Sequence, residues 1–235
     1  MEYSNLMNEL QNKSDKFFDD LKLTSNNITN ANTPGYKSER NTDFEKVIKN
    51  MEKGQLVNTN DPKDISLDGN GFFVLLNTEN KPLLARNIRL EVDKDLYLKC
   101  GDNYIYPKTK ITKLYPEYKV SENGEIFGID SKDGTKVKLT ELKIVDFPAT
   151  DKLEFDGKYY YHTAEAGEMK EIKAGELMGT QVFQKMNETS NVNSPLEFMK
   201  FSTTSRQLRI MAQMMQLLNT SEKDQISSLT TLITS

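Results

Sequence analysis

Apolar residues recur in steps of three and four near both ends of the chain, and this spacing predicts two long helices. The first helix is expected over residues 3–30, where one narrow stripe runs between charged positions. Its stripe consists of Tyr3, Met7, Leu10, Ser14, Phe17, Leu21, Thr24 and Ile28. The second stripe consists of Phe201, Thr204, Leu208, Met211, Met215, Leu218, Glu222, Gln225, Leu229 and Leu232. A long helix with one thin stripe needs a partner, so the two ends are expected to pair.

Two capping boxes are expected at helix starts. Ser194 is followed by Pro195 and, three residues after the serine, by Glu197, which is the spacing of a capping box with proline in the first turn. Thr42 and Glu45 have the same spacing and predict a short helix that continues to residue 51.

Between residues 55 and 187 the pattern changes to short alternating runs separated by turn residues. Residues 72–76 form an apolar run, and residues 77–82 are typical of a hairpin turn. Asn123-Gly124 and Asp133-Gly134 are further turn signals, and residues 137–147 alternate well. The predicted fold class is therefore α+β, with a mostly-β, barrel-like or sandwich-like central domain and terminal coiled-coil helices that pair.

A polar segment, SNNITNANTPGYK at residues 25–37, follows the first helical stripe. It holds four asparagines, which are Asn26, Asn27, Asn30 and Asn32. Their side chains compete with the helical backbone for hydrogen bonds, Thr33 precedes a proline, and Gly35 allows conformations that a side chain forbids. One helix end needs only a residue or two, so we interpret the segment as an ordered joint that contacts another segment or subunit. The alternative is a capped helix end with no such role.

These patterns divide the chain into four segments. They are the N-terminal helix and joint at residues 1–37, a short helix or linker at residues 38–54, the central β domain at residues 55–187, and the C-terminal helix at residues 188–235.

Composition excludes several classes of function. The chain has 31 Lys+Arg against 35 Asp+Glu, a formal charge of −4, so no nucleic-acid partner is expected. A single cysteine, Cys100, cannot form an internal disulfide, and a single histidine, His162, removes most histidine-based metal and triad chemistry. No apolar run is long enough for membrane insertion, and the N-terminus lacks the layout of a classical signal peptide.

Two short motifs carry candidate binding chemistry. Gly69 and Gly71 could suggest a phosphate loop, but the third glycine and the lysine of such loops are missing, so a turn is favoured. Asp61, Asp64 and Asp68 are spaced like calcium ligands without the rest of a calcium loop, so capping and turn roles are favoured. No carboxylate pair has a distinctive context either. We therefore expect no enzyme activity, no cofactor and no metal.

Three segments carry a resemblance to a known family. They are residues 25–37, residues 54–74 with the sequence GQLVNTNDPKDISLDGNGFFV, and residues 188–193 with the sequence ETSNVN. In this order they resemble the flagellar rod and hook family of bacterial axial proteins. The chain departs from the family at residues 85–90, where Ile88 stands in place of a glycine that the family's Thr-Arg-Asp-Gly turn typically has. The large central insertion of a hook subunit is also missing, which implies a rod subunit, proximal or distal.

The resemblance implies a structural protein that polymerises helically into the drive shaft between motor and hook. In this family the terminal helices are similar to a coiled coil that forms an inner tube, with the β domain outside it. The implied partners are other copies of the chain, other rod and hook subunits, and the flagellar type III export apparatus. The implied location is the periplasm-spanning rod of the basal body. Alternatives are a hook-type axial protein, a cell-wall glycan hydrolase, or an adaptor that forms no filament.

The candidate subunit-interface residues come from the two stripes and the joint. They are Leu10, Phe17, Leu21, Asn26, Asn27, Asn30, Asn32, Thr33, Gly35, Tyr36, Leu208, Met211, Met215, Leu218 and Leu229.

Overall fold

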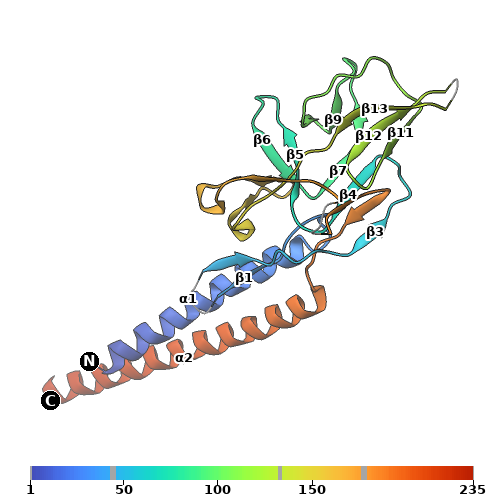
Figure 1. Cartoon of the computed structure of the whole chain (residues 1–235). Helices are drawn as coiled ribbons and strands as arrows, with labels where there is room; N and C mark the ends of the chain where they lie inside the picture. The colour runs from blue at the N-terminus through green and yellow to red at the C-terminus, as the bar shows by residue number, and fades with distance from the viewer. Residues whose placement is uncertain (1, 43–45, 132–133, 176–178, 235) are drawn as a thin grey trace.

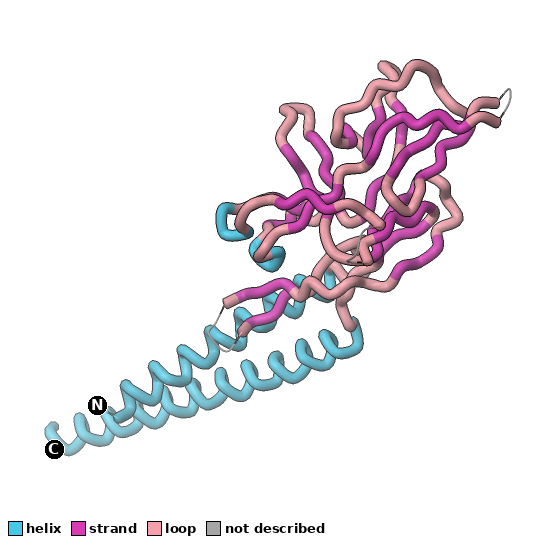
Figure 2. Tube along the Cα trace, viewed as in Figure 1, coloured by secondary structure: helices cyan, strands magenta, loops and turns pink. Residues whose placement is uncertain are grey.

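The structure is a computed structural model that describes residues 2–42, 46–131, 134–175 and 179–234, with side chains from residue 4 to residue 221 of these ranges. A helical hairpin projects from one end of a β domain, and both chain termini lie at the free end of this hairpin (Figure 1). Almost all strands are gathered at the other end (Figure 2). None of the described helices combines the length and apolar character that crossing a membrane requires. The predicted α+β fold class is confirmed.

The two terminal helices pair along the predicted stripes. Helix α1 (Glu2–Thr29) runs toward the β domain and α2 (Ser194–Thr234) runs away from it, side by side and antiparallel (Figure 1). Leu10 and Met211 are buried, and the other described members of both stripes are half-buried or buried with one exception. The exception is Phe201, which is exposed. The seam is therefore thin, as its sequence pattern predicted.

Two local predictions about helix starts are wrong. The cap of α2 is Asn193, whose Oδ1 accepts from the Leu196 backbone N–H at 3.2 Å, whereas Ser194 already belongs to the helix. The short helix expected over residues 42–51 is not found, because residues 47–49 form a strand. Residues 43–45 of that capping box lie outside the described residues.

The strand that replaces the short helix belongs to a small hairpin beside α1. Strand β1 (Glu39–Asn41) pairs antiparallel with β2 (Val47–Lys49), with Arg40 opposite Ile48. This hairpin lies along α1, between the joint and the free end of the helices (Figure 1). It extends the helical part of the molecule with a short sheet that the sequence pattern did not indicate.

The largest sheet of the β domain has nine strands. Its main path is β15-β16-β6-β5-β10-β9-β8, and β14 pairs with both β5 and β17. Their bounds are β5 (Phe72–Leu76), β6 (Pro82–Ala85), β8 (Glu91–Val92), β9 (Leu98–Cys100), β10 (Asn103–Ile105), β14 (Ile144–Asp146), β15 (Glu154–Phe155), β16 (Tyr160–Tyr161) and β17 (Lys170–Ile172).

Three smaller sheets complete the domain, in the orders β18-β4-β7, β11-β12-β13 and β19-β3. Their bounds are β3 (Leu56–Asn58), β4 (Asp64–Asp68), β7 (Asn87–Arg89), β11 (Glu117–Val120), β12 (Glu125–Ile129), β13 (Lys136–Glu141), β18 (Gln181–Gln184) and β19 (Met186–Glu188). Two short 3-10 helices, η1 (Thr150–Lys152) and η2 (Ala164–Ala166), lie beside the large sheet. No described sheet closes into a barrel, so that form of the central domain is not found.

The turn signals of the central domain are mostly confirmed. Residues 77–81 connect β5 to β6, and Gly124 sits in the β11–β12 hairpin with a positive φ of 84°. The alternating run at residues 137–147 is divided between β13 and β14, which belong to different sheets. Asp133 lies outside the described residues.

The β domain has two hydrophobic cores that meet at β5. Phe73 and Leu75 point into the larger core, with Ile65 and Ile144. Phe72 points into the smaller core, which packs nearest the joint. Alternate residues of one strand thus serve opposite faces, as a strand buried on both sides requires. Most buried apolar side chains therefore lie in the β domain, whereas the described part of the helical hairpin buries apolar side chains mainly along its seam.

Candidate functional site

The candidate site is the joint at residues 25–37, where α1 ends and the chain enters the β domain. The first part of the joint stabilises its own turn. The Asn30 side chain donates to the Asn26 carbonyl at 3.0 Å, and the Thr33 hydroxyl donates to Asn30 Oδ1 at 3.1 Å. Gly35 then adopts a positive φ of 73°, and an added Cβ would lie 2.9 Å from the Arg86 Cβ. Glycine is needed here for both its conformation and its small size.

Asn27 joins three elements in one hydrogen-bonded cluster. Its Nδ2 donates to the Glu39 carbonyl at 2.7 Å and to Glu197 Oε2 at 3.1 Å. Its Oδ1 accepts from the Tyr36 hydroxyl at 3.0 Å and from the Glu39 N–H at 2.8 Å. Asn27 is only 2% exposed, and a buried amide without hydrogen-bond partners would destabilise the fold. Because both the nitrogen and the oxygen of this amide have partners, its burial is compatible with a stable fold. The cluster fixes α1 to β1 and to the first turn of α2.

Glu188, the last residue of β19, is the centre of a second cluster. Its Oε1 accepts from Lys37 Nζ at 2.7 Å and from the Gly54 N–H at 2.7 Å. Its Oε2 accepts from Arg86 Nε at 2.6 Å. The three charged side chains, which we call the buried triad, are between 1% and 4% exposed. Such groups are stable only when they are paired and hydrogen-bonded, as these are.

The backbone of Glu188 is held as closely as its side chain. Its carbonyl accepts from the Gly35 N–H at 2.8 Å and from Asn87 Nδ2 at 2.9 Å, and its N–H donates to Asn87 Oδ1 at 2.7 Å. The Tyr160 hydroxyl donates to the Gly35 carbonyl at 2.9 Å. Segments that are far apart in the sequence therefore meet at one residue. They include the ends of all three segments that carry the family resemblance.

Asn191 holds the small hairpin beside α1 in place through hydrogen bonds of its side chain. Its Oδ1 accepts from the Ser38 N–H at 2.7 Å, and its Nδ2 donates to the carbonyls of Asn50 at 2.7 Å and Glu52 at 2.9 Å. One side chain thus closes the base of the β1–β2 hairpin against the segment that leads into α2.

The electrostatics of the buried triad follow from burial and pairing. Burial alone would raise the pKa of the Glu188 carboxyl, but the attraction of Arg86 and Lys37 outweighs burial, so the pKa lies below its usual value. Burial lowers the pKa of the Lys37 ammonium, and Glu188 opposes this shift only in part. Burial, followed by the nearby Glu39 and Glu197 carboxylates, raises the pKa of Tyr36. The tyrosine therefore acts as a neutral hydrogen-bond donor.

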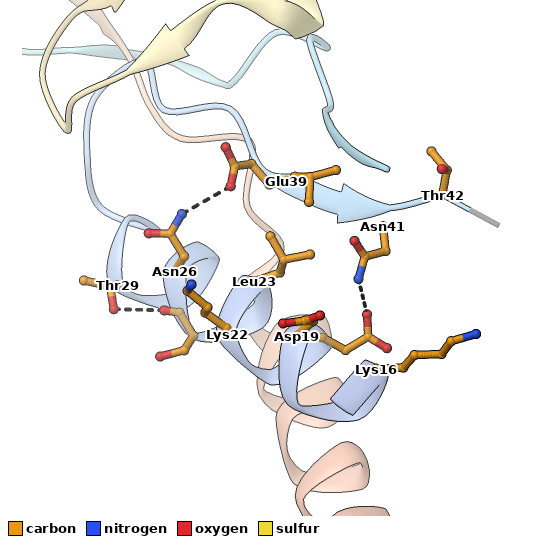
Figure 3. A pocket seen from close by; sticks show the side chains of 12 residues that line it. Lys16, Asp19, Lys22, Leu23, Asn26, Thr29, Glu39, Asn41 and Thr42 are labelled. Carbon is orange, nitrogen blue, oxygen red and sulfur yellow. Dashed lines mark hydrogen bonds between the residues drawn. The ribbon is translucent and has the colours of Figure 1, made fainter. Parts of the chain in front are cut away.

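A groove of about 810 Å³ lies between α1 and the β1–β2 hairpin, next to the joint. Figure 3 shows Asn26 and Glu39 facing each other across it, and Asn26 Nδ2 donates to Glu39 Oε2 at 3.4 Å. Asn41 donates to Asp20 at 2.6 Å further along. The lining is Lys16, Asp19, Asp20, Lys22, Leu23, Ser25, Asn26, Thr29, Glu39, Asn41, Thr42 and Val47. The lining mixes charged, polar and apolar groups, and most of it comes from α1.

The comparisons with known proteins find similarity to flagellar rod proteins. The family model described as "Flagella basal body rod protein" matches residues 20–37, which are the end of α1 and the joint. The "Flagellar basal-body rod protein FlgG" of Buchnera aphidicola subsp. Acyrthosiphon pisum (strain APS) is 24% identical over 225 residues, covering 81% of this chain and 86% of the relative. The protein of the same name from Buchnera aphidicola subsp. Baizongia pistaciae (strain Bp) is 22% identical over the same shares.

The predicted resemblance to the flagellar basal-body rod family is confirmed. The model match falls on the end of α1 and the asparagine-rich joint, so the part of this chain that connects its first helix to its β domain is similar to the rod family. The alignment with the relatives extends the likeness over most of the chain.

The structure places the predicted interface residues in three settings. Those buried or half-buried on the helical seam are Leu10, Phe17, Leu21, Leu208, Met211, Met215 and Leu218. Those buried or half-buried in the joint are Asn27, Asn30, Thr33, Gly35 and Tyr36, whereas Asn26 and Asn32 are exposed. Leu229 lies in α2 beyond the described side chains. The joint finds partners within its own chain, and a role of any of these residues between subunits stays a prediction.

The carboxylates considered as calcium ligands are paired with cations instead. Arg89 Nη1 contacts Asp64 Oδ1 at 2.7 Å and Arg89 Nη2 contacts Asp61 Oδ2 at 2.6 Å. Asp68 pairs with Lys53 at 2.7 Å. Asp61 also accepts from the Lys63 N–H, as a turn residue does. The described residues hold no group of three or more potential metal ligands.

Sequence reasoning missed the residues at the centre of the site. Glu188 stood at the start of the third segment, but nothing in its spacing indicated that it would be buried. Arg86 stood in the segment that departs from the family pattern, and Glu197 was assigned to a capping box. Arg86 directly follows the apolar run at residues 82–85, where a charged side chain needs a partner, and this signal could have found it. Glu188 has polar neighbours in the sequence and gives no such signal.

We predict that Glu188→Gln destabilises the β domain by about 3–5 kcal/mol, because it leaves Lys37 and Arg86 buried without a counter-charge. Lys37→Met is expected to cost less, because the Arg86–Glu188 pair survives. Lys53→Met breaks only an exposed pair and should cost about 1 kcal/mol or less. Urea unfolding followed by circular dichroism measures all three. Equal losses for the three variants would contradict the role of Glu188.

We also predict a pH dependence that belongs to Glu188. Its pKa is lower in the folded state, so its ionisation stabilises the fold above the unfolded carboxyl pKa of about 4.3. This stabilisation should be lost as the pH falls from there through the lower pKa of the folded state. The difference in free energy of unfolding between the wild type and Glu188→Gln should shrink over that range, and a constant difference would argue against the assignment.

Gly54→Ala tests the close packing around the same carboxylate. An added Cβ would lie 1.9 Å from the Thr189 carbonyl oxygen, so the backbone must shift and weaken the hydrogen bond from Gly54 to Glu188. We expect a loss of about 1–3 kcal/mol, measured as a fall in Tm. Gly101→Asn is the control, because Gly101 is exposed and asparagine tolerates its positive φ of 58°.

Proposed function

We propose that the chain is a structural subunit of the flagellar basal-body rod that polymerises helically through its terminal helices. The relatives named as rod proteins and the family match on the joint support a structural role in the rod. The finer statement, that copies of the chain associate through their helices, is supported by an observation on the surface of α2.

Helix α2 carries a second apolar row that α1 does not cover. Its members are between 40% and 70% exposed, and they are Leu196, Met199, Ile210, Met214 and Leu217. Together with Thr203, which lies between Met199 and Ile210, they are spaced three, four or seven residues apart. We call these five residues the open row. At about 100° per residue, the open row lies roughly a third of a turn from the seam that faces α1. A helix with two apolar rows fits between two partners.

Energetics favour a second partner for the open row. Burying one such side chain contributes about 1.5–3 kcal/mol, so five of them can outweigh the entropy lost in ordering a neighbouring subunit. Leu6 and Phe18 of α1 are exposed as well, at 43% and 65%. A contact between the open row of one copy and a different surface of the next is a head-to-tail contact, which continues from copy to copy unless the rotation between copies closes a ring. Repeated contacts of this kind generate a helical filament.

In the assembled rod, the paired helices form the inner tube and the β domain lies outside it. The rod then acts as the drive shaft between motor and hook. The thin seam has a second consequence, because it buries too little area to hold both helices firmly in a free subunit. Order that is gained on assembly would let the chain ends pass through the flagellar type III export channel. Other rod and hook subunits are the expected neighbours.

The experiment tests the open row directly. We expect Ile210→Asp combined with Met214→Asp to raise the protein concentration needed for assembly by at least about a hundredfold, because two apolar contacts are replaced by charges that would be buried. Sedimentation over a range of concentrations, with electron microscopy of the pellet, measures this. Motility of cells that carry the variant is the second readout.

The matched control is Ala212→Asp combined with Gln216→Asp. Both residues are exposed, have the same spacing as the test pair, and lie on the other side of α2 at two positions further along. The control should assemble as the wild type does. If both pairs assemble normally, the open row does not carry the subunit contact. If full-length protein resists proteolysis at both ends as a dilute monomer, ordering on assembly is wrong as well.

A further inference from the structure

The buried triad has two cations and one carboxylate. Lys37 and Arg86 both pair with Glu188, and all three side chains are at most 4% exposed. A buried cluster of ionised groups is most stable when its charges balance. When all three are ionised, this cluster carries one positive charge more than its own carboxylate neutralises.

The two cations also have hydrogen-bond donors to spare. Of the three N–H groups of the Lys37 ammonium, two are used, by Glu188 and by the Glu52 carbonyl. Of the five N–H groups of Arg86, three are used, by Glu188 and by the carbonyls of Gly71 and Leu67. Among the described residues, three N–H groups of these two cations therefore have no acceptor.

Both cations line a cavity of about 310 Å³ on the side of the joint that faces the large sheet. Its other walls are the turn at residues 69–72 and the segment from Asp146 to Thr150, with Met51 at the edge. A water molecule takes about 30 Å³ in the liquid, so the cavity has room for a small ion with several waters. Two buried cations with spare donors thus line one cavity, and an oxygen acceptor with negative charge suits such a combination.

We propose that this cavity binds a carboxylate group, held by the spare N–H groups of Lys37 and Arg86. A planar carboxylate matches the fork of a guanidinium and can reach a neighbouring ammonium with its second oxygen. The group is either a free small carboxylate or an Asp or Glu side chain of another copy of the chain. The chemistry is the same in both cases.

Because of Asp146, the cavity is better suited to an anion with one negative charge than to an anion with two. Its carboxylate lies in the wall of the cavity, and its Oδ1 accepts from the Phe147 N–H at 2.9 Å. The negative charge of Asp146 opposes any anion, and it opposes a phosphate dianion about twice as strongly as a carboxylate. The site therefore discriminates by charge, and Asp146 sets how tightly it binds.

The test uses sodium acetate as the probe and the full-length protein. We expect acetate to shift the amide resonances of Gly71 and Phe72 and the Arg86 side-chain N–H resonance, saturably and with a Kd in the millimolar range. Asp146→Asn should lower this Kd by about threefold to tenfold, because the variant removes the opposing charge and keeps the Oδ1 acceptor. Asp102→Asn, the same change in an exposed turn, should leave the Kd unchanged.

Two results would overturn the proposal. One is equal shifts with acetate and with sodium chloride at the same ionic strength, and the other is a Kd that Asp146→Asn does not change. The source of the carboxylate is decided in buffer without acetate. If the same resonances move as the protein concentration rises, and acetate reverses the change, a neighbouring copy supplies the group. If they do not move while acetate still saturates the site, the ligand is a free carboxylate.

Discussion

The buried carboxylate of Glu188 joins the helical part of the molecule to the β domain. Its side chain accepts from Lys37 in the joint, Arg86 directly after β6 and Gly54 before β3. These segments lie far apart in the sequence. A hydrophobic contact would tolerate sliding between them, whereas charge-assisted hydrogen bonds fix both distance and direction. Burying these charges is unfavourable unless they are well paired, so only an arrangement that keeps every pair in good geometry is stable.

The two halves of the molecule are stabilised by different means. The β domain has two apolar cores whose largest side chains are fully buried, and it resembles an ordinary globular domain in its packing. The helical hairpin buries little beyond Leu10 and Met211 along its seam. The joint connects a densely packed part of the molecule to a thinly packed part. A polar, hydrogen-bonded joint suits this connection, because its bonds fix distance and direction without an apolar core.

The fold could be predicted from the sequence wherever one short-range pattern dominates. The stripes of both helices, the turn at residues 77–82 and the Asn123-Gly124 hairpin are of this kind. The prediction of a short helix at residues 42–51 is wrong because a capping box is only a local signal. Strand β2 forms instead by pairing with β1, and Asn191, which is distant in sequence, bonds to the chain just after it. The Asn-rich joint was correctly recognised as an ordered element, but its partners were not. Glu188, Arg86 and Glu197 are charged residues whose burial arises only when distant segments meet.

The joint also determines what the open row can do. Asn27 bonds to Glu197 in the first turn of α2, and Asn193 caps the same turn. These contacts fix the rotation of α2 about its axis at the point where the helix leaves the β domain. An apolar row on a helix is useful to a neighbour only if it faces a defined direction, since a rotation of one residue turns it by about 100°. The direction in which Leu196 and Met199 point is therefore set by Asn27 and Glu197, and a change in the polar joint would reach the proposed subunit contact through the helix without touching any apolar residue.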